Sequence, residues 1–294
     1  MVKNISFASS FLIIGLCFIM STNTLAQKAL PKKSKQKSDT AKTMTYQEWK
    51  KNLQNDLNAV TIAFQKSKPK DMNERIIFAG NSTFRLLMII GRAIDRSSLY
   101  ASQIAEHRTK FDAQYKSAKE PAKKMVNGFV SMYSMYGTIA TMYTRAGKNT
   151  VLVNEIDEIE EAVQQKMHAK ISAMEITSTV GAAGYKLLAL TLREADTSGV
   201  LKESLTSVQQ NYTEGEKVAE SDEDRFLNAV FRMFELSHLW AFAIDQTAKE
   251  SLNKLYASVI EKSKAAEEIG EQIAVAVEHL YYATHAIAMG YVKR

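Results

Sequence analysis

The longest stretch of this chain free of helix-breaking proline follows Pro121, the last of three prolines. Apolar side chains recur there at intervals of three and four residues, the spacing of one face of an α-helix. No run alternates apolar and polar residues as a half-buried strand does, and no Asn-Gly or Asp-Gly pair separates two such runs. We therefore expect residues 45–294 to be all-α, an elongated antiparallel helical bundle of about six to eight helices without a β-sheet.

Two local signals mark helix starts. Thr45 followed by Glu48 matches a capping box, in which the hydroxyl and the carboxylate each accept a backbone N–H of the other residue. Ser221 precedes three acidic residues, and a helix dipole favours negative charge in its first turn. Both positions are predicted to begin helices.

Interruptions are expected near Ser97-Ser98 and at Ser198-Gly199, where small and flexible residues cluster. Pro121 suits the first turn of a further helix, which we expect to stop at Gly147. No repeat of 20–50 residues is recognisable in the sequence. Apart from these interruptions, helix is expected through most of residues 72–118, 150–195 and 222–294.

Two segments, residues 125–144 and 176–192, are apolar around most of a helix. Such a helix is buried either in a protein core or in a membrane, and the many Ser, Thr and Gly residues favour the core. The alternative is a membrane-active protein that exposes residues 125–144 or 176–192. Aromatic residues also crowd one predicted helix, which we expect to be the central one: Phe226, Phe231, Phe234, Trp240 and Phe242.

The N-terminus has the three parts of a cleavable signal peptide. Lys3 precedes an uninterrupted apolar run over residues 11–20, and small residues stand at the −3 and −1 positions before Gln27. Residues 1–26 are therefore predicted to be removed on export to a periplasm or to the extracellular medium. The only cysteine is Cys17, so the exported chain would contain no disulfide.

Residues 27–44 are rich in lysine and poor in apolar side chains, and we predict a disordered tether. This tether carries nearly all of the excess charge, because the net charge is +6 whereas residues 46–294 hold 31 basic and 31 acidic residues. A neutral body argues against a nucleic-acid-binding surface. The tether itself is expected to contact anionic surfaces weakly or to serve as a spacer.

No nucleophile motif, phosphate-binding glycine loop or zinc-protease signature occurs, so no enzymatic activity and no cofactor is predicted. One pattern points to a metal or haem alternative. Glu235 and His238 form an E-x-x-H pair on one helical face, as in di-iron bundles, and His279 or His285 of the last helix would complete the site. The competing interpretation is an ordinary ion pair between Arg232 and Glu235.

Glu278 and His285 lie seven residues apart, which places them on one face of the last helix with Tyr281 and Tyr282 between them. Glu278 is about 200° around the helix from Leu280, a member of the apolar stripe, at 100° per residue. We therefore expect Glu278 to point away from the core, toward solvent or toward a binding partner.

Taken together, these features indicate an exported helical protein with a non-enzymatic structural or protein-interaction role in the cell envelope. Its expected partners are other envelope proteins, and no nucleic acid is expected among them. Two alternatives belong to other classes: a metal- or cofactor-binding bundle, and a membrane-active helical protein.

Overall fold

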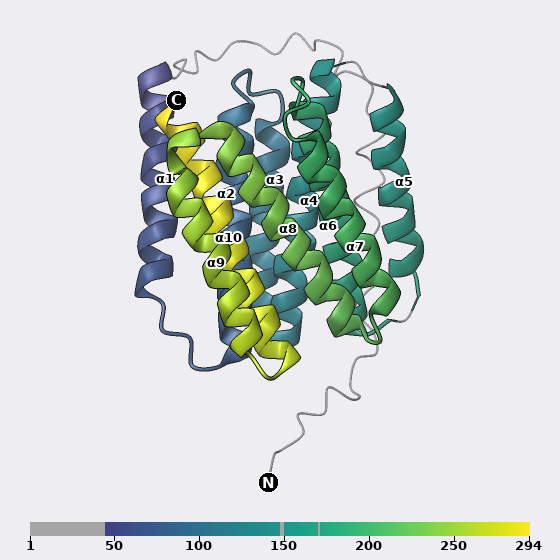
Figure 1. Cartoon of the computed structure of the whole chain (residues 1–294). Coiled ribbons are helices and arrows are strands. Elements are labelled where there is room, and N and C mark those ends of the chain that lie inside the picture. The colour runs from purple at the N-terminus through teal and green to yellow at the C-terminus, as the bar shows by residue number, and fades with distance from the viewer. Residues whose placement is uncertain (1–44, 148–149, 170) are drawn as a thin grey trace.

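The computed structural model describes residues 45–147, 150–169 and 171–294, and every regular element within these ranges is a helix. Ten α-helices are joined by short loops and one 3₁₀ turn, Gln246–Ala248 (Figure 1). Their bounds are α1 Tyr46–Lys66, α2 Met72–Ile94, α3 Ala101–Ser117, α4 Pro121–Gly147, α5 Thr150–Met167, α6 Ala173–Ala195, α7 Lys202–Val218, α8 Asp222–Ile244, α9 Lys249–Ala265 and α10 Ile269–Lys293. The all-α prediction is confirmed, whereas the expected number of six to eight helices is too low.

The even-numbered helices form a closed inner ring. Each packs along the next, from α2 to α4, α6, α8 and α10, and α10 packs back against α2. Each odd-numbered helix lies outside this ring, against the inner helix that follows it, and also touches the inner helix that precedes it. Successive helices run antiparallel, so the five inner helices share one direction. A closed ring of five helical hairpins therefore replaces the expected elongated bundle.

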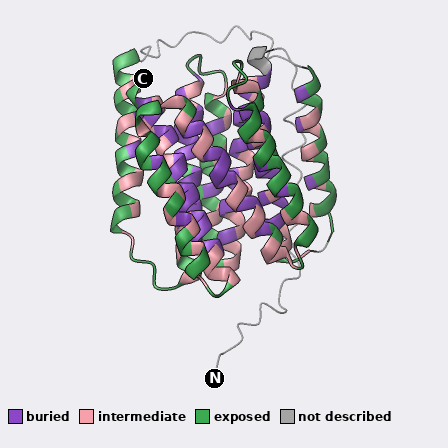
Figure 2. Ribbon diagram, viewed as in Figure 1, coloured by how far each residue is buried: buried purple, intermediate pink, exposed green. Residues whose placement is uncertain are grey.

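The two layers differ sharply in burial. Inner helix α2 buries fifteen residues, and α6 and α10 bury thirteen and fourteen. Outer helices α1, α3, α7 and α9 bury two residues each, and α5 buries three. Figure 2 shows the same division, with buried residues in the middle of the molecule and exposed ones on the outer helices. The hydrophobic core is therefore the inner ring itself and its contacts with the outer layer.

Helix α4 fills the axis of the ring with three aromatic side chains, Phe129, Tyr136 and Tyr143, spaced seven residues apart so that they lie on one face. Each reaches helices that are not the neighbours of α4 in the ring. The Phe129 ring meets the ring of Phe226 of α8 edge-on at 4.7 Å, and the Tyr143 hydroxyl lies 2.8 Å from that of Tyr291 of α10. The centre is consequently a packed core rather than a pore.

Small residues on the neighbouring inner helices make room for this stripe. A Cβ atom on Gly184 of α6 would lie 3.3 Å from the end of Met233 and 3.5 Å from the Tyr136 ring. The small residues at 181–184 thus permit the close helix approach that such residues allow in general. The expectation of one central helix in residues 222–244 is wrong, since α8 shares the core with four other helices and α4 supplies the axial stripe.

The five hairpins constitute a structural repeat that is almost invisible in the sequence. The inner helices begin at Met72, Pro121, Ala173, Asp222 and Ile269, so the unit recurs every 47–52 residues. The structure therefore corrects the expectation of a chain without repeats, because five similar units are present although the sequence does not reveal them. Because each inner helix packs against different neighbours, its core residues differ, and only parts of the loops retain a common pattern.

That pattern is clearest in the loops after α2 and α6. Asp95 and Asp196 end these helices with nearly identical backbone angles, φ −78° and ψ 61° against φ −83° and ψ 66°. Each carboxylate accepts two backbone N–H groups, from the residues four and five positions later, at distances of 2.7–3.1 Å. Three residues after each aspartate the backbone has positive φ, at Ser98 (57°) and at Gly199 (73°).

The predicted helix starts and two predicted breaks are confirmed. Thr45 with Glu48 forms a complete capping box, and Ser221 forms another with Asp224. The breaks near residues 97–98 and 198–199 are the two aspartate-capped loops. Three breaks were missed, at 168–172, 245–248 and 266–268, because none of these loops contains Pro or Gly.

Both apolar segments belong to inner helices, residues 125–144 to α4 and residues 176–192 to α6. Within the described ranges, α2 is the one helix long and apolar enough to cross a membrane, and 83% of its most apolar window is buried inside the ring. This burial is what a core helix of a packed protein has. The predicted signal peptide (1–26) and tether (27–44) lie outside the described residues.

Candidate functional site

Glu235, the carboxylate of the predicted E-x-x-H pair, is buried on α8 and fully engaged. Its Oε2 accepts a hydrogen bond from Arg232 Nη1 at 2.7 Å, and its Oε1 accepts one from the Tyr256 hydroxyl of α9 at 2.9 Å. The ion pair that the sequence suggested between residues 232 and 235 is therefore present, and Tyr256 joins it from the outer layer. Burial and the Glu235 charge raise the pKa of Tyr256 to about 12, so its hydroxyl remains a donor.

His238 lies one turn further along α8 and is half-buried. Its ring lies 5.5 Å from that of Tyr256 and 6.3 Å from that of Phe234, in an aromatic environment. Burial lowers the pKa of His238 below its ordinary value, so the imidazole is neutral near pH 7. Within the described chain its Nε2 atom is buried without a hydrogen-bond partner.

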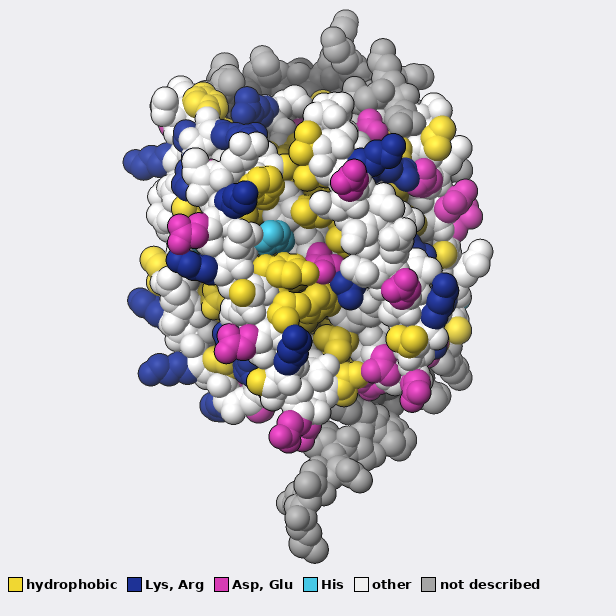
Figure 3. Space-filling model, viewed as in Figure 1, with side chains coloured by type: hydrophobic (Ala, Val, Ile, Leu, Met, Phe, Trp, Pro, Cys, Tyr) yellow, Lys and Arg dark blue, Asp and Glu magenta, His cyan; other side chains and the backbone are white. Residues whose placement is uncertain are grey.

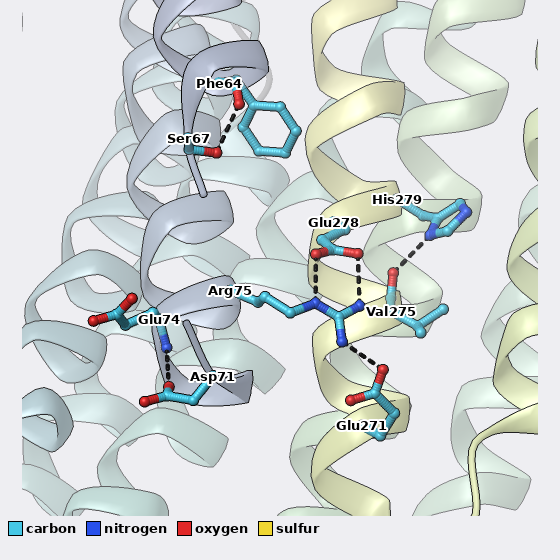
Figure 4. Close-up of polar contacts among 9 residues, drawn as sticks. All are labelled: Phe64, Ser67, Asp71, Glu74, Arg75, Glu271, Val275, Glu278 and His279. Carbon is cyan, nitrogen blue, oxygen red and sulfur yellow. Dashed lines mark hydrogen bonds and ion pairs between the residues drawn. The ribbon is translucent and has the colours of Figure 1, made fainter. Parts of the chain in front are cut away.

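The two histidines of α10 are held by other partners. His279 is buried, and its Nδ1 lies 2.7 Å from the Val275 carbonyl oxygen (Figure 4). Its Nε2 lies 3.3 Å from Ser258 Oγ of α9. His285 is directed toward α1, where its Nε2 lies 2.8 Å from Thr61 Oγ1. Burial lowers the pKa of both histidines.

These four residues do not converge on one point. The Phe234 ring stands near both His238 and His279, with centroid distances of 6.3 and 6.2 Å, while His285 belongs to the α1 side of α10. Across residues 45–147, 150–169 and 171–294, no group of three or more His, Cys, Asp or Glu side chains is arranged to hold a metal ion. In this structure Glu235, His279 and His285 have hydrogen-bond partners, whereas His238 Nε2 has none among the described residues.

A hollow on the surface exposes part of α8 between the outer helices α7 and α9. Figure 3 shows hydrophobic side chains gathered there around a histidine, with acidic and basic side chains at the rim. Four half-buried residues lie on this outward face of α8 at spacings of 4, 7 and 4: Leu227, Phe231, His238 and Phe242. We call this row the α8 outer face.

A second surface feature is a pocket of about 410 Å³ between α1, α2 and α10. Its aromatic residues are Phe64 of α1, Phe78 of α2, and Tyr281 and Tyr282 of α10. Arg75, Glu278 and His285 also line it, so the predicted common face of Glu278 and His285 does point toward a recess in the outer surface. We call it the α1–α10 pocket.

Arg75 organises the charged side of this pocket. Its Nε and Nη2 donate to the two carboxylate oxygens of Glu278 at 2.8 and 3.0 Å, and its Nη1 donates to Glu271 (Figure 4). The hydrogen bonds to Glu278 raise the pKa of the Arg75 guanidinium. The sequence could not reveal this pairing, because Arg75 and Glu278 are 203 positions apart. In the sequence, the one indication of this pocket was the pair of neighbouring tyrosines, Tyr281 and Tyr282, between Glu278 and His285.

In comparisons with known proteins, no family model matches the chain, and neither curated proteins nor solved structures yield a match.

Proposed function

We propose that this chain is an exported cell-envelope protein with a non-enzymatic role, and that it binds a partner protein through the α8 outer face. The observation that carries this proposal is the apolar surface that Figure 3 shows over α8, together with the half-buried apolar side chains on one face of that helix. Contiguous apolar surface rimmed by charged residues is typical of interaction sites.

The occupant that best fits this face is an amphipathic helix of the partner. The spacing of Leu227, Phe231 and Phe242 follows one face of α8, so a helix lying along α8 would meet all three in register. The outer layer supplies the precedent, because each odd-numbered helix already lies in this manner against inner helices while burying only two or three residues. A partner helix between α7 and α9 would extend that layer.

The hydrogen bonds of Glu235 and His279 support a structural role over a catalytic one for these two residues. Glu235 is bound by Arg232 and Tyr256, and His279 by Val275 and Ser258. A catalytic carboxylate or imidazole needs a free position toward a substrate.

The test is capture of the tagged full-length protein from its native cells after mild crosslinking, followed by mass spectrometry. The double variant Phe231→Glu/Phe242→Glu introduces charge into the α8 outer face. The matched control Leu99→Glu/Val200→Glu places the same charges at exposed loop positions, 78% and 75% accessible. We expect one near-stoichiometric protein with the wild type and the control, and its loss with the α8 variant.

If the α8 variant still captured that protein, the interface would lie on another surface of the molecule. Recovery of the wild-type chain alone would contradict an interaction role. The export proposal has a separate test. Amino-terminal sequencing of the protein from the envelope fraction should begin at Gln27, and a chain beginning at residue 1 or 2 in the cytoplasm would refute it.

The metal-binding alternative keeps one favourable feature, the buried Nε2 of His238 described above. Elemental analysis of the purified protein tests it: stoichiometric metal that disappears in His238→Ala would favour this alternative, and metal-free wild-type protein would remove it. For the membrane-active alternative, the inner ring must open to expose residues 125–144 or 176–192, which leakage from liposomes would report.

A further inference from the structure

The α1–α10 pocket has the dimensions of a small-molecule site. Its volume of about 410 Å³ falls within the range of roughly 300–1,000 Å³ found for ligand pockets. It opens where the outer layer leaves part of α10 uncovered beside the C-terminal half of α1. It is distinct from the α8 outer face, since no residue of α8 lines it.

One wall of the pocket is a fixed aromatic cluster centred on Phe64. The Phe64 ring stacks on Tyr281 with a centroid distance of 3.6 Å and an interplanar angle of 12°. Tyr282 meets Phe64 edge-on at 5.6 Å, and Phe78 closes the cluster from α2 at 5.6 Å. Tyr282 remains 45% exposed, so part of its ring is free to contact a ligand.

Other lining residues carry planar polar groups that are held in place. The guanidinium of Arg75 and the carboxylate of Glu278 form a two-point ion pair, which fixes both planes and compensates both charges. The Gln65 side chain adds an amide at the rim, and Ser67 lies nearby with its hydroxyl donated to the Phe64 carbonyl oxygen.

Further along the pocket, His285 and Thr61 contribute uncharged polar atoms, joined by a 2.8 Å hydrogen bond. Burial lowers the pKa of His285, which keeps the imidazole neutral at physiological pH. The pocket therefore combines aromatic faces with donors and acceptors, and its two charged lining side chains, Arg75 and Glu278, are paired with each other.

We propose that the α1–α10 pocket binds a neutral saccharide ring or short oligosaccharide. A pyranose has an apolar face of C–H bonds that packs on an aromatic ring, here Tyr282, and a rim of hydroxyls that pair with planar amide, carboxylate and guanidinium groups, here Gln65, Glu278 and Arg75. Because those groups are already oriented by the ion pair, little side-chain freedom is lost on binding.

A charged ligand fits this pocket less well. An anion would meet two carboxylates, Glu271 and Glu278, that outnumber the one guanidinium, and a cation would compete with Arg75 for them. Displacement of Arg75 would sacrifice charge-assisted hydrogen bonds in a half-buried site. A neutral ligand leaves the ion pair intact.

The test is isothermal titration calorimetry of the full-length protein with maltotriose, cellotriose and triacetylchitotriose, alongside glucuronic acid and glucosamine as charged probes. We expect at least one neutral trisaccharide to bind with a Kd in the range of about 0.1–5 mM. The variants Tyr282→Ala and Gln65→Ala should each weaken that binding by about tenfold or more. Tyr282→Phe, which keeps the ring, should retain most of it.

Tyr46→Ala is the matched control, because Tyr46 is an equally exposed tyrosine of α1, 50% accessible and outside the pocket. It should bind like the wild type, and circular dichroism should show native helix content in every variant. The proposal is overturned if no neutral sugar binds at about 10 mM, if only the charged probes bind, or if Tyr282→Ala binds as tightly as Tyr46→Ala. None of these outcomes bears on the α8 outer face.

Discussion

The inner and outer layers of this ring use the same secondary structure for different purposes. Inner helices such as α2 are buried on nearly every side, whereas an outer helix such as α1 touches the ring by one narrow stripe that includes Leu53 and Leu57. Burial of apolar surface is the main favourable term in folding, so most of the stability resides in the inner layer. The outer layer, with gaps between its helices, carries the two surfaces for which binding is proposed.

The difference in stability between the inner and outer layers can be tested most directly at the axis of the ring. Tyr136 is fully buried among helices of the inner ring, so Tyr136→Ala should lower the free energy of unfolding by about 3–5 kcal/mol. Tyr46→Ala on outer helix α1 should cost less than about 0.5 kcal/mol. Urea unfolding monitored by circular dichroism measures both. Equal losses would show that the layers share stability evenly.

A second test lies where the layers meet. Glu160 of α5 faces Gly137 and Tyr133 of α4, and burial together with the charge of Asp157 raises the pKa of Glu160 to about 7. A raised folded-state pKa contributes stability below about pH 4.5 that is lost as the pH rises through about 7. Glu160→Gln should therefore have little effect at pH 4.5 and should stabilise the protein by roughly 1–3 kcal/mol at pH 8.

Thermal unfolding across that pH range measures this effect. The control is Glu158→Gln, which removes an exposed carboxylate of the same helix. A Glu160→Gln variant that tracks the wild type at every pH would show that this carboxylate is solvated.

The loops that connect an inner helix to the next outer helix should respond alike despite their different sequences. Asp95→Ala and Asp196→Ala each remove two hydrogen bonds to backbone N–H groups, so each should lower the midpoint of chemical denaturation. Chemical denaturation compares them, with Asp95→Asn and Asp196→Asn as partial restorations. A large effect at one loop and none at the other would argue against the structural equivalence of the two hairpins.

The smallest effects are expected at the outermost positions of those loops. Leu99 and Val200 are the equivalent exposed residues, and Leu99→Ser and Val200→Ser should change stability by less than about 0.5 kcal/mol. The same denaturation experiment measures them. A larger loss would reveal that these apolar side chains are covered, for example by a second copy of the chain.

Local sequence signals predicted local features well. The capping boxes at Thr45 and Ser221 depend on residues three positions apart, and both form as expected. The loop at 266–268 was not predicted from the sequence, because alanine and glutamate are good helix formers. The chain turns there because α9 and α10 pack against each other. Helix identity was therefore predictable, while helix number was underestimated.

The contacts at the candidate sites also divide into local ones, which the sequence predicts, and long-range ones, which it does not. Arg232 and Glu235 are three residues apart on one helix, and their ion pair was foreseeable. The bond between His285 and Thr61 and the stack of Phe64 on Tyr281 join residues more than 200 positions apart, so no local spacing could indicate them. The candidate metal ligands Glu235, His238, His279 and His285 also have contacts with other helices, which no local spacing could indicate.

The helical character of this chain follows from its residues alone, because the period of the apolar residues, the caps and the lack of later prolines act within a few turns. The closure of the helices into a ring, the axial position of the α4 side chains and the pocket beside α10 follow from the packing of distant helices. Closure depends on the fit of α10 against α2, two helices at opposite ends of the described chain. Shape complementarity of that kind is a property of the packed whole, and no short window of residues contains it.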